Sequence, residues 1–358
     1  MDRNSPKRRR WMLYGAYGFT GRMILQEALR RGHRPIIAGR DAKRLSDLAK
    51  HHDLSWRVVS LEDLSALPAS LDGIDLVLNA AGPFSETGAR LIAVCLDAGI
   101  SYADVSGEFH HIRALAAYDV AARKAGIAIL TGAGFGVTFG ECLAHLALAR
   151  VRNVKRLRVS VAAANAQTTA TVQRTVVEVL AKGGYAVERG KLRHRALAHS
   201  HWTVQDLGEN NAFAAAPLGE LAALHRSANI SDIVVGRPMP ARQARILRLL
   251  SPWLRLALSI PALRKRAVRG GSKPEIATAS DHAPEFQSRI WVEVWDDLEH
   301  LHLFRLETGE GYAETAKATI VNVEEMLASE SLSGSFTPAS AFGYALLDKF
   351  DGVLIKGD

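Results

Sequence analysis

The first 130 residues alternate between short apolar runs and helical patterns, and this alternation predicts an α/β fold with a doubly wound parallel sheet of the Rossmann type. The strongest observation lies at 13–21, where three glycines spaced G-x-x-G-x-x-G separate an apolar run at 11–14 from a helical pattern at 22–31. The order of strand, glycine turn and helix is typical of a dinucleotide site. The length of 358 residues leaves room for a second α/β or α+β domain, since one domain takes roughly 150 residues.

The glycine turn is the first predicted part of the cofactor site. Gly15 can adopt the positive φ of a tight turn, Gly18 leaves room for a pyrophosphate, and Gly21 lets the helix pack close to the strand. The N-terminus of the next helix offers N–H groups and a partial positive charge to phosphates. The alternative is a plain turn that opens a helix. The other predicted cofactor contacts in this turn are Tyr17, Phe19 and Thr20.

A second short strand, at 35–39, ends at Arg40, where an acidic residue would accept the ribose 2′-OH of NAD. Arg40 and Lys43, with Arg44 after them, suit the 2′-phosphate of NADP instead. The sequence therefore predicts NADP, bound as NADPH. Asp41, expected to cap the following helix, keeps NAD open as the alternative, and a solvated arginine is the other reading.

The remaining strands of the first domain are predicted at 56–60, 76–79, 101–104 and 127–130. Ligands of such sheets bind beyond the carboxyl ends of the strands, where small residues follow 76–79 and polar ones follow 101–104. The predicted cofactor contacts in these loops are Ala80, Ala81, Gly82, Pro83, Phe84, Ser106 and Gly107.

Three side chains around the fifth strand are the candidate catalytic residues: Tyr102, Asp104 and Glu108. Strand alternation places Tyr102 and Asp104 on one face, and a proton donor for a reduced carbon or nitrogen must come from such a position. Alternatively, Asp104 and Ser106 only cap the next helix. None of the tyrosines has a lysine four residues later, which argues against the tyrosine–lysine pair of short-chain dehydrogenases.

Four stretches, 14–21, 79–84, 102–108 and 132–136, together resemble the saccharopine dehydrogenase-like oxidoreductase family. Within that family the chain is most similar to the branch of trans-acting enoyl reductases. The resemblance implies an NADPH-dependent transfer of hydride to a C=C or C=N bond of a small-molecule, carrier-bound or CoA-bound substrate. It also implies a Rossmann domain at 1–134, a second domain at 135–334 for substrate and dimerisation, and a closing segment at 335–358 that returns to the first domain. A homodimer is expected.

Composition excludes several other classes. The net charge of +8 is less than the charge of one segment, 237–274, which has ten Lys/Arg and no Asp/Glu; a second basic cluster lies at 7–10. The rest of the chain is therefore slightly acidic, which argues against a nucleic-acid surface.

Two separate cysteines suit a reducing cytoplasm. His110-His111 and His199-x-His201 lack a carboxylate at ligand spacing, so no metal is predicted.

The basic stretch 241–269 also contains bulky apolar residues, and Pro252 and Pro261 are expected to break it into short helices. It favours peripheral membrane contact, a lid near a lipid-like substrate, or a site for an acidic carrier. An ordinary helical pair packed on the second domain, with its cations solvated, is the alternative. No run of about 18 uncharged apolar residues is present.

Overall fold

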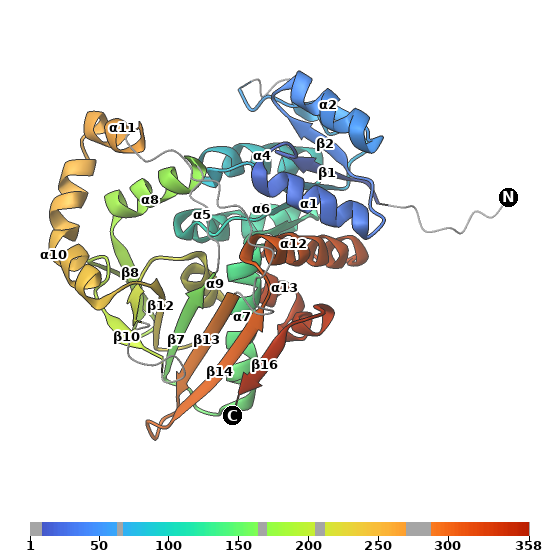
Figure 1. The fold of residues 1–358 in the computed structure, drawn as a ribbon. Helices are drawn as coiled ribbons and strands as arrows, with labels where there is room; N and C mark the ends of the chain where they lie inside the picture. Colours follow the sequence, from blue (N-terminus) through green and yellow to red (C-terminus); the bar gives the residue numbers. More distant parts are fainter. Residues whose placement is uncertain (1–8, 63–66, 164–169, 205–211, 270–287, 358) are drawn as a thin grey trace. The chain divides into compact units, whose positions relative to one another are not determined.

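A computed structural model describes residues 9–62, 67–163, 170–204, 212–269 and 288–357 (Figure 1). The chain forms two compact units, which are considered separately. The first unit comprises Met1–Ser106, Ala114–Gly134 and Thr315–Thr337. The second comprises Gly107–Arg113, Phe135–Glu314 and Pro338–Asp358. Lys7 and Arg8 of the N-terminal basic cluster, and residues 270–274 of the basic segment, lie outside the described residues.

The first unit contains a seven-stranded sheet with the order β15-β6-β5-β4-β1-β2-β3, in which every pairing is parallel. The strand order reverses between β1 and β4, the position at which doubly wound sheets bind their ligand. The predicted Rossmann fold is confirmed. The strands are β1 (Trp11–Tyr14), β2 (Ile36–Gly39), β3 (Trp56–Val58), β4 (Leu76–Asn79), β5 (Ser101–Asp104), β6 (Ala128–Leu130) and β15 (Gly334–Phe336).

Helices alternate with these strands along the chain. All residues of β1, β2 and β4 are buried, as expected of a parallel sheet covered on both faces. The helices are α1 (Phe19–Arg30), α2 (Ala42–His52), α3 (Leu67–Ser70), α4 (Phe84–Ala98), α6 (Asp119–Ala125) and α12 (Gly311–Ala328), with a 3₁₀ turn η1 (Ala116–Tyr118). Helix α5 (Phe109–Leu115) lies mostly in the second unit, and α12 begins there.

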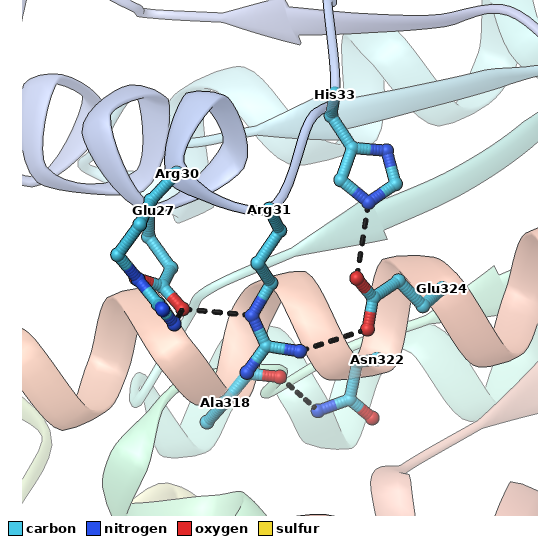
Figure 2. A network of polar contacts seen from close by, with 7 residues as sticks. All are labelled: Glu27, Arg30, Arg31, His33, Ala318, Asn322 and Glu324. Carbon is cyan, nitrogen blue, oxygen red and sulfur yellow. Dashed lines mark hydrogen bonds and ion pairs between the residues drawn. The ribbon is translucent and has the colours of Figure 1, made fainter.

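Helix α12 is tied to α1 by a network of ion pairs (Figure 2). Arg31 donates to Glu324 at 3.0 Å, and Nε2 of His33 lies 3.0 Å from the other oxygen of the same carboxylate. Arg31 also donates to Glu27, which accepts from Arg30 as well. The hydrogen bond from Arg30 is the main cause that lowers the pKa of Glu27. The network joins a segment near the end of the chain to the first helix.

The second unit contains a mixed sheet with the order β10-β11-β12-β7-β13-β14-β16, to which β8 and β9 add off the main path. Its strands are β7 (Arg156–Ala162), β8 (Gly184–Glu188), β9 (Lys191–Arg195), β10 (His201–Thr203), β11 (Ala212–Ala215), β12 (Asp232–Pro238), β13 (Ser288–Trp295), β14 (Leu301–Thr308) and β16 (Leu354–Gly357). Its helices are α7 (Phe135–Arg150), α8 (Ala170–Lys182), α9 (Gly219–Ser227), α10 (Ala241–Leu258), α11 (Pro261–Arg269) and α13 (Pro338–Phe342), with a 3₁₀ helix η3 (Tyr344–Lys349).

The end of the chain differs from the segment predicted at 335–358. The part that joins the first unit is Thr315–Thr337. Here β15 pairs with β6, and Glu324 of α12 forms a salt bridge with Arg31 at the end of α1. Pro338–Asp358 groups with the second unit, because β16 pairs antiparallel with β14.

The prediction that Pro252 breaks the basic stretch is wrong, since α10 continues through it. Proline removes one N–H donor from a helix, but Pro252 is exposed, so water can solvate the carbonyl that loses its partner. Pro261 does stand at a break, as the first residue of α11.

Candidate cofactor-binding site

Two glycines of the β1–α1 turn are required by close packing. Gly15 has φ +85°, and a Cβ placed on it would lie 2.8 Å from the Cβ of Ala81 in the β4–α4 loop. A Cβ on Gly21 would lie 2.2 Å from the carbonyl oxygen of Gly15. Both distances are too short for real atoms, so a side chain at either position would push the turn out of place.

Gly18 differs from these two glycines. Its φ of −69° is ordinary for any residue, and a Cβ there would meet only the carbonyl oxygen of Gly15, at 3.2 Å. Gly18 is the N-cap of α1, with no side-chain cap and no acidic residue in the first turn. A bare, acid-free helix N-terminus fits an anion such as a pyrophosphate. Phe19 and Thr20, which begin α1, lie at this same end.

Two arginines contact Tyr17 where β2 ends, Arg40 through its backbone and Arg44 through its guanidinium. The backbone N–H of Arg40 donates to the hydroxyl of Tyr17 at 3.2 Å. The guanidinium carbon of Arg44 lies 4.5 Å from the centroid of the Tyr17 ring, and Arg44 donates to the carbonyl of Tyr17 at 3.3 Å. With exposed Lys43 beside them, these groups fit a 2′-phosphate. Asp41 accepts from the backbone N–H of Arg44 at 3.0 Å, which confirms the predicted cap.

The sequence indicates Arg44 only as a further cation after Arg40 and Lys43. Only the structure shows that its guanidinium stacks on Tyr17. Tyr17 in turn covers Gly39, because a Cβ at Gly39 would lie 2.5 Å from the tyrosine ring. Tyr17 of the β1–α1 turn therefore positions the guanidinium of Arg44, which follows β2.

A buried hydrogen-bonded chain crosses the carboxyl ends of β4, β5 and β6. The side-chain amide of Asn79 donates to the hydroxyl of Tyr102 at 3.1 Å, and that hydroxyl donates to Asp104 at 3.0 Å. Asp104 also accepts from the backbone N–H groups of Ser106, at 3.0 Å, and Gly132, at 3.3 Å. We call this set the Asn79–Asp104 network. It holds three strand ends and the loops that leave them.

The network explains the chemistry of the two predicted catalytic residues in the first unit. Tyr102 and Asp104 are both 0% exposed. Burial is the main cause that raises the pKa of Tyr102 well above its ordinary value, and the neighbouring Asp104 adds to it. Their arrangement matches the capping alternative, in which Asp104 holds the backbone of the following loop.

The β4–α4 loop is fixed by the same amide. Asn79 accepts from the backbone N–H of Ala81 at 2.9 Å and donates to Thr87 at 3.1 Å. Thr87 donates to the carbonyl of Ala81 at 2.6 Å, and the N–H of Ala80 donates to the carbonyl of Tyr14 at 2.9 Å. The small residues predicted to border the cofactor therefore have a fixed backbone. Gly82 and Pro83 complete this loop, and Phe84 begins α4.

Glu108 and Gly107, two further predicted residues, belong to the second unit. The carbonyl of Gly107 accepts from the N–H of Gly219 at 3.0 Å, and Glu108 forms an isolated β-bridge with Leu218. Glu108 as a residue is 9% exposed, and its carboxylate lies 3.5 Å from the hydroxyl of Thr175.

A buried acid that sequence reasoning did not single out stands next to this bridge, in α9. Burial raises the pKa of Glu220. Its Oε1 lies so close to Gly136 that a Cβ there would come within 2.2 Å of it. In the part of the chain that the structure describes, no group of three or more His, Cys, Asp or Glu side chains could hold a metal ion.

Comparison with known proteins identifies the first unit. Residues 11–130 match the family model of the saccharopine dehydrogenase NADP-binding domain. The predicted resemblance and the predicted cofactor, NADP, are confirmed by this match. The matched residues contain the glycine turn, the cations around Tyr17 and most of the Asn79–Asp104 network.

Individual relatives agree with the family model. A trans-acting enoyl reductase of Mycobacterium tuberculosis is 32% identical over 143 residues, which are 37% of this chain and 34% of that protein. A saccharopine dehydrogenase-like oxidoreductase of Arabidopsis thaliana is 30% identical over 141 residues, or 35% of this chain and 31% of that protein. The chain thus matches about a third of the length of these relatives.

The fold is shared more widely than the sequence. Saccharopine dehydrogenase (L-Glu forming) from Saccharomyces cerevisiae aligns with 98% of this chain and 99% of its own, with a TM-score of 0.64 at 13% identity. This likeness shows a common fold for the chain, including the second unit.

Gly18→Val should abolish NADPH binding and leave the fold largely intact, because its Cβ has one close contact, with the carbonyl oxygen of Gly15 at 3.2 Å, while the side chain would fill the space of the pyrophosphate. Isothermal titration with NADPH measures the affinity, and circular dichroism checks the fold. Gly21→Val is the matched control: it should unfold the turn, since its Cβ would meet backbone at 2.2 Å. Unchanged affinity in a folded Gly18→Val variant would contradict this site.

Arg40→Ala should weaken NADPH far more than NADH. One lost charge-assisted contact costs roughly 1.5–3 kcal/mol, or about tenfold to 150-fold in Kd. Fluorescence titration with both cofactors measures the ratio, and Lys50→Ala, an exposed cation near the other end of α2, is the control. Equal losses for the two cofactors, or a wild-type preference for NADH, would refute the 2′-phosphate role.

Tyr102→Phe should lower the free energy of unfolding by about 1–3 kcal/mol, because it leaves buried Asp104 and Asn79 each without one partner. Urea denaturation at pH 7 measures the change. Tyr344→Phe, at an exposed tyrosine, should leave the midpoint unaltered. If Tyr102→Phe is as stable as the wild type, the network contributes nothing to the fold.

Proposed function

We propose that the protein is an NADPH-dependent reductase that delivers a hydride to a polarised C=C or C=N bond. The stacking of Arg44 on Tyr17, with exposed Arg40 at the end of β2, carries this proposal, since two guanidinium groups there suit the phosphate that distinguishes NADPH from NADH. The names of the matched relatives, an enoyl reductase and an oxidoreductase, support the reaction type.

The protein's own residues bind and orient, while NADPH, when bound, supplies the hydride. The N-terminus of α1 and Gly18 would hold the pyrophosphate, and the cations around Tyr17 would hold the 2′-phosphate. The fixed β4–α4 loop would border the ribose and nicotinamide, because it follows the strand next to the switch point.

Tyr102 and Asp104 are proposed as positioning residues, because both side chains are fully buried and used in the Asn79–Asp104 network. They keep the loops after β5 and β6 in place. Glu108 stays a predicted proton donor. The substrate is proposed to be a small molecule, free or attached to a carrier or to CoA, and a homodimer remains a prediction that sedimentation equilibrium can check.

The burial of Tyr102 and Asp104 also supports a second candidate function. Because neither predicted acid of the first unit is accessible, an NADP-binding sensor or scaffold without catalysis is the competing proposal. Such a protein would bind NADPH with the affinity set by Arg40 and transfer nothing.

The experiment that separates the two offers NADPH deuterated at C4 with either an enoyl thioester or a cyclic imine. A reductase consumes NADPH, followed at 340 nm, and mass spectrometry finds deuterium in the reduced product. The folded Gly18→Val variant should be inactive. Tight NADPH binding with no product from either substrate class would overturn the reductase in favour of the sensor.

A further inference from the structure

Helix α10 exposes large apolar side chains that its own unit does not cover. Trp253 is 70% exposed, Leu249 74% and Leu256 65%. The remaining strongly exposed apolar residues of α10 and α11, and of the link between them, are Ile246, Leu250, Ile260 and Leu263. Within α10, Leu249, Trp253 and Leu256 recur at the spacing of one helical face. Contiguous apolar surface of this kind marks an interaction site.

This exposed face lies opposite the face by which α10 is attached. The attached side is formed by Ala244, Ser251 and Leu258, which are buried. Ala244 packs in a small cluster with two alanines of the second unit, and Ser251 accepts from the backbone N–H of Leu197 at 2.9 Å. Leu249 and Trp253 each lie two positions from Ser251, a rotation of about 200°. Helix α10 thus packs one face against the second unit and exposes an opposite, apolar face to solvent.

Cations border the exposed face. Arg242, Arg245 and Arg248 are exposed, and no Asp or Glu occurs between 237 and 274. In α11, Arg264 pairs with Glu178 of α8 at 3.0 Å, whereas Lys265 and Arg266 are exposed. Figure 1 shows α10 and α11, in orange, beside α8. Every charged side chain of α10 and α11 themselves is therefore positive, and the acid nearest to them among the ion pairs is Glu178 of α8.

Among the described residues, no single helix has the length and apolar composition to cross a membrane. Helices α10 and α11 meet that criterion only together, with a bend of 113° between them. A pair bent this sharply, with one face of α10 packed on its own unit, suits a position in the plane of a bilayer surface rather than across it.

We propose that α10 and α11 form a membrane-binding surface for anionic lipid. The apolar side chains insert between the acyl chains at the interface, and the bordering arginines contact lipid phosphates. A second copy of the chain fits less well, because a two-fold contact would bring the same arginines against one another without any acid to pair them. An acidic carrier protein offers charge but no counterpart for the inserted Trp253.

The test uses the full-length protein with vesicles of phosphatidylcholine alone or with 30% phosphatidylglycerol, a composition chosen so that only the second is anionic. Co-sedimentation should detect the protein on anionic vesicles only, and high salt should release it, since exposed charges are screened within a few ångströms there. Binding to both compositions alike, or to neither, would overturn the proposal.

Two sets of variants separate the apolar and the electrostatic parts. Arg242→Gln with Arg245→Gln and Arg248→Gln should lower the partition coefficient about 100-fold, at about 1 kcal/mol for each cation near such a surface. The charge-matched control changes Arg150, Arg152 and Lys155 to Gln, all exposed elsewhere in the second unit. If the control loses binding equally, only net charge matters and the surface is misassigned.

Leu249→Ser with Leu256→Ser should lower binding at least tenfold without changing the thermal midpoint, because both side chains are exposed in the folded protein. Val120→Ser with Leu298→Ser is the control, since these residues are 78% and 71% exposed on other elements. Brominated lipid should quench part of the tryptophan fluorescence of the wild type but not of Trp253→Phe. Equal quenching of both proteins would show that α10 does not insert.

The two other candidate partners of this face, a second copy of the chain and an acidic carrier protein, would give different results. A dimer in solution that Leu249→Ser with Leu256→Ser dissociates, in a protein that does not bind anionic vesicles, would assign this face to a second copy. Binding of an acidic carrier protein that competes with vesicles for α10 would leave the membrane surface intact as a shared site. Carrier binding without any vesicle binding would overturn the proposal.

Discussion

The first unit depends on one buried constraint, the hydrogen-bonded chain from Asn79 through Tyr102 to Asp104. A carboxylate with no exposed surface is tolerated only when donors surround it, and here one hydroxyl and two backbone N–H groups do so. These donors come from β5 and from the loops that follow β5 and β6. The bond from Asn79 to Tyr102 adds the end of β4, so the whole network fixes the relative positions of three loops. Those loops border the switch point of the sheet.

The network and the glycine turn support each other. Asn79 fixes the backbone of Ala81, and Ala81 packs against Gly15 so tightly that no side chain fits at Gly15. In the same glycine turn, the ring of Tyr17 packs against Gly39 on one strand end, and the guanidinium of Arg44 stacks on that ring. The groups proposed to bind phosphate are thus held in place by hydrogen bonds and packing elsewhere in the first unit.

The sequence could predict those parts of the site that depend on neighbouring residues. The strands at 11–14, 76–79 and 101–104 have the predicted bounds, since apolar runs bounded by glycine or polar residues determine them locally. The cap by Asp41 is equally local. The stacking of Arg44 on Tyr17, the bond from Gly132 to Asp104 and the pairing of β16 with β14 join residues far apart in the chain, which no local pattern encodes.

The pairing of β15 with β6 has a consequence for how the protein is made. The two strands are neighbours in the sheet, but about two hundred residues separate them in the chain. A ribosome therefore releases β1 to β6 long before the strand that covers the edge of β6, and before the helix whose Glu324 meets Arg31. During that interval β6 presents unpaired backbone groups, a template for association with other chains. Most of the second unit is therefore synthesised while the edge of β6 is uncovered, and nascent chains are exposed to aggregation until β15 has left the ribosome.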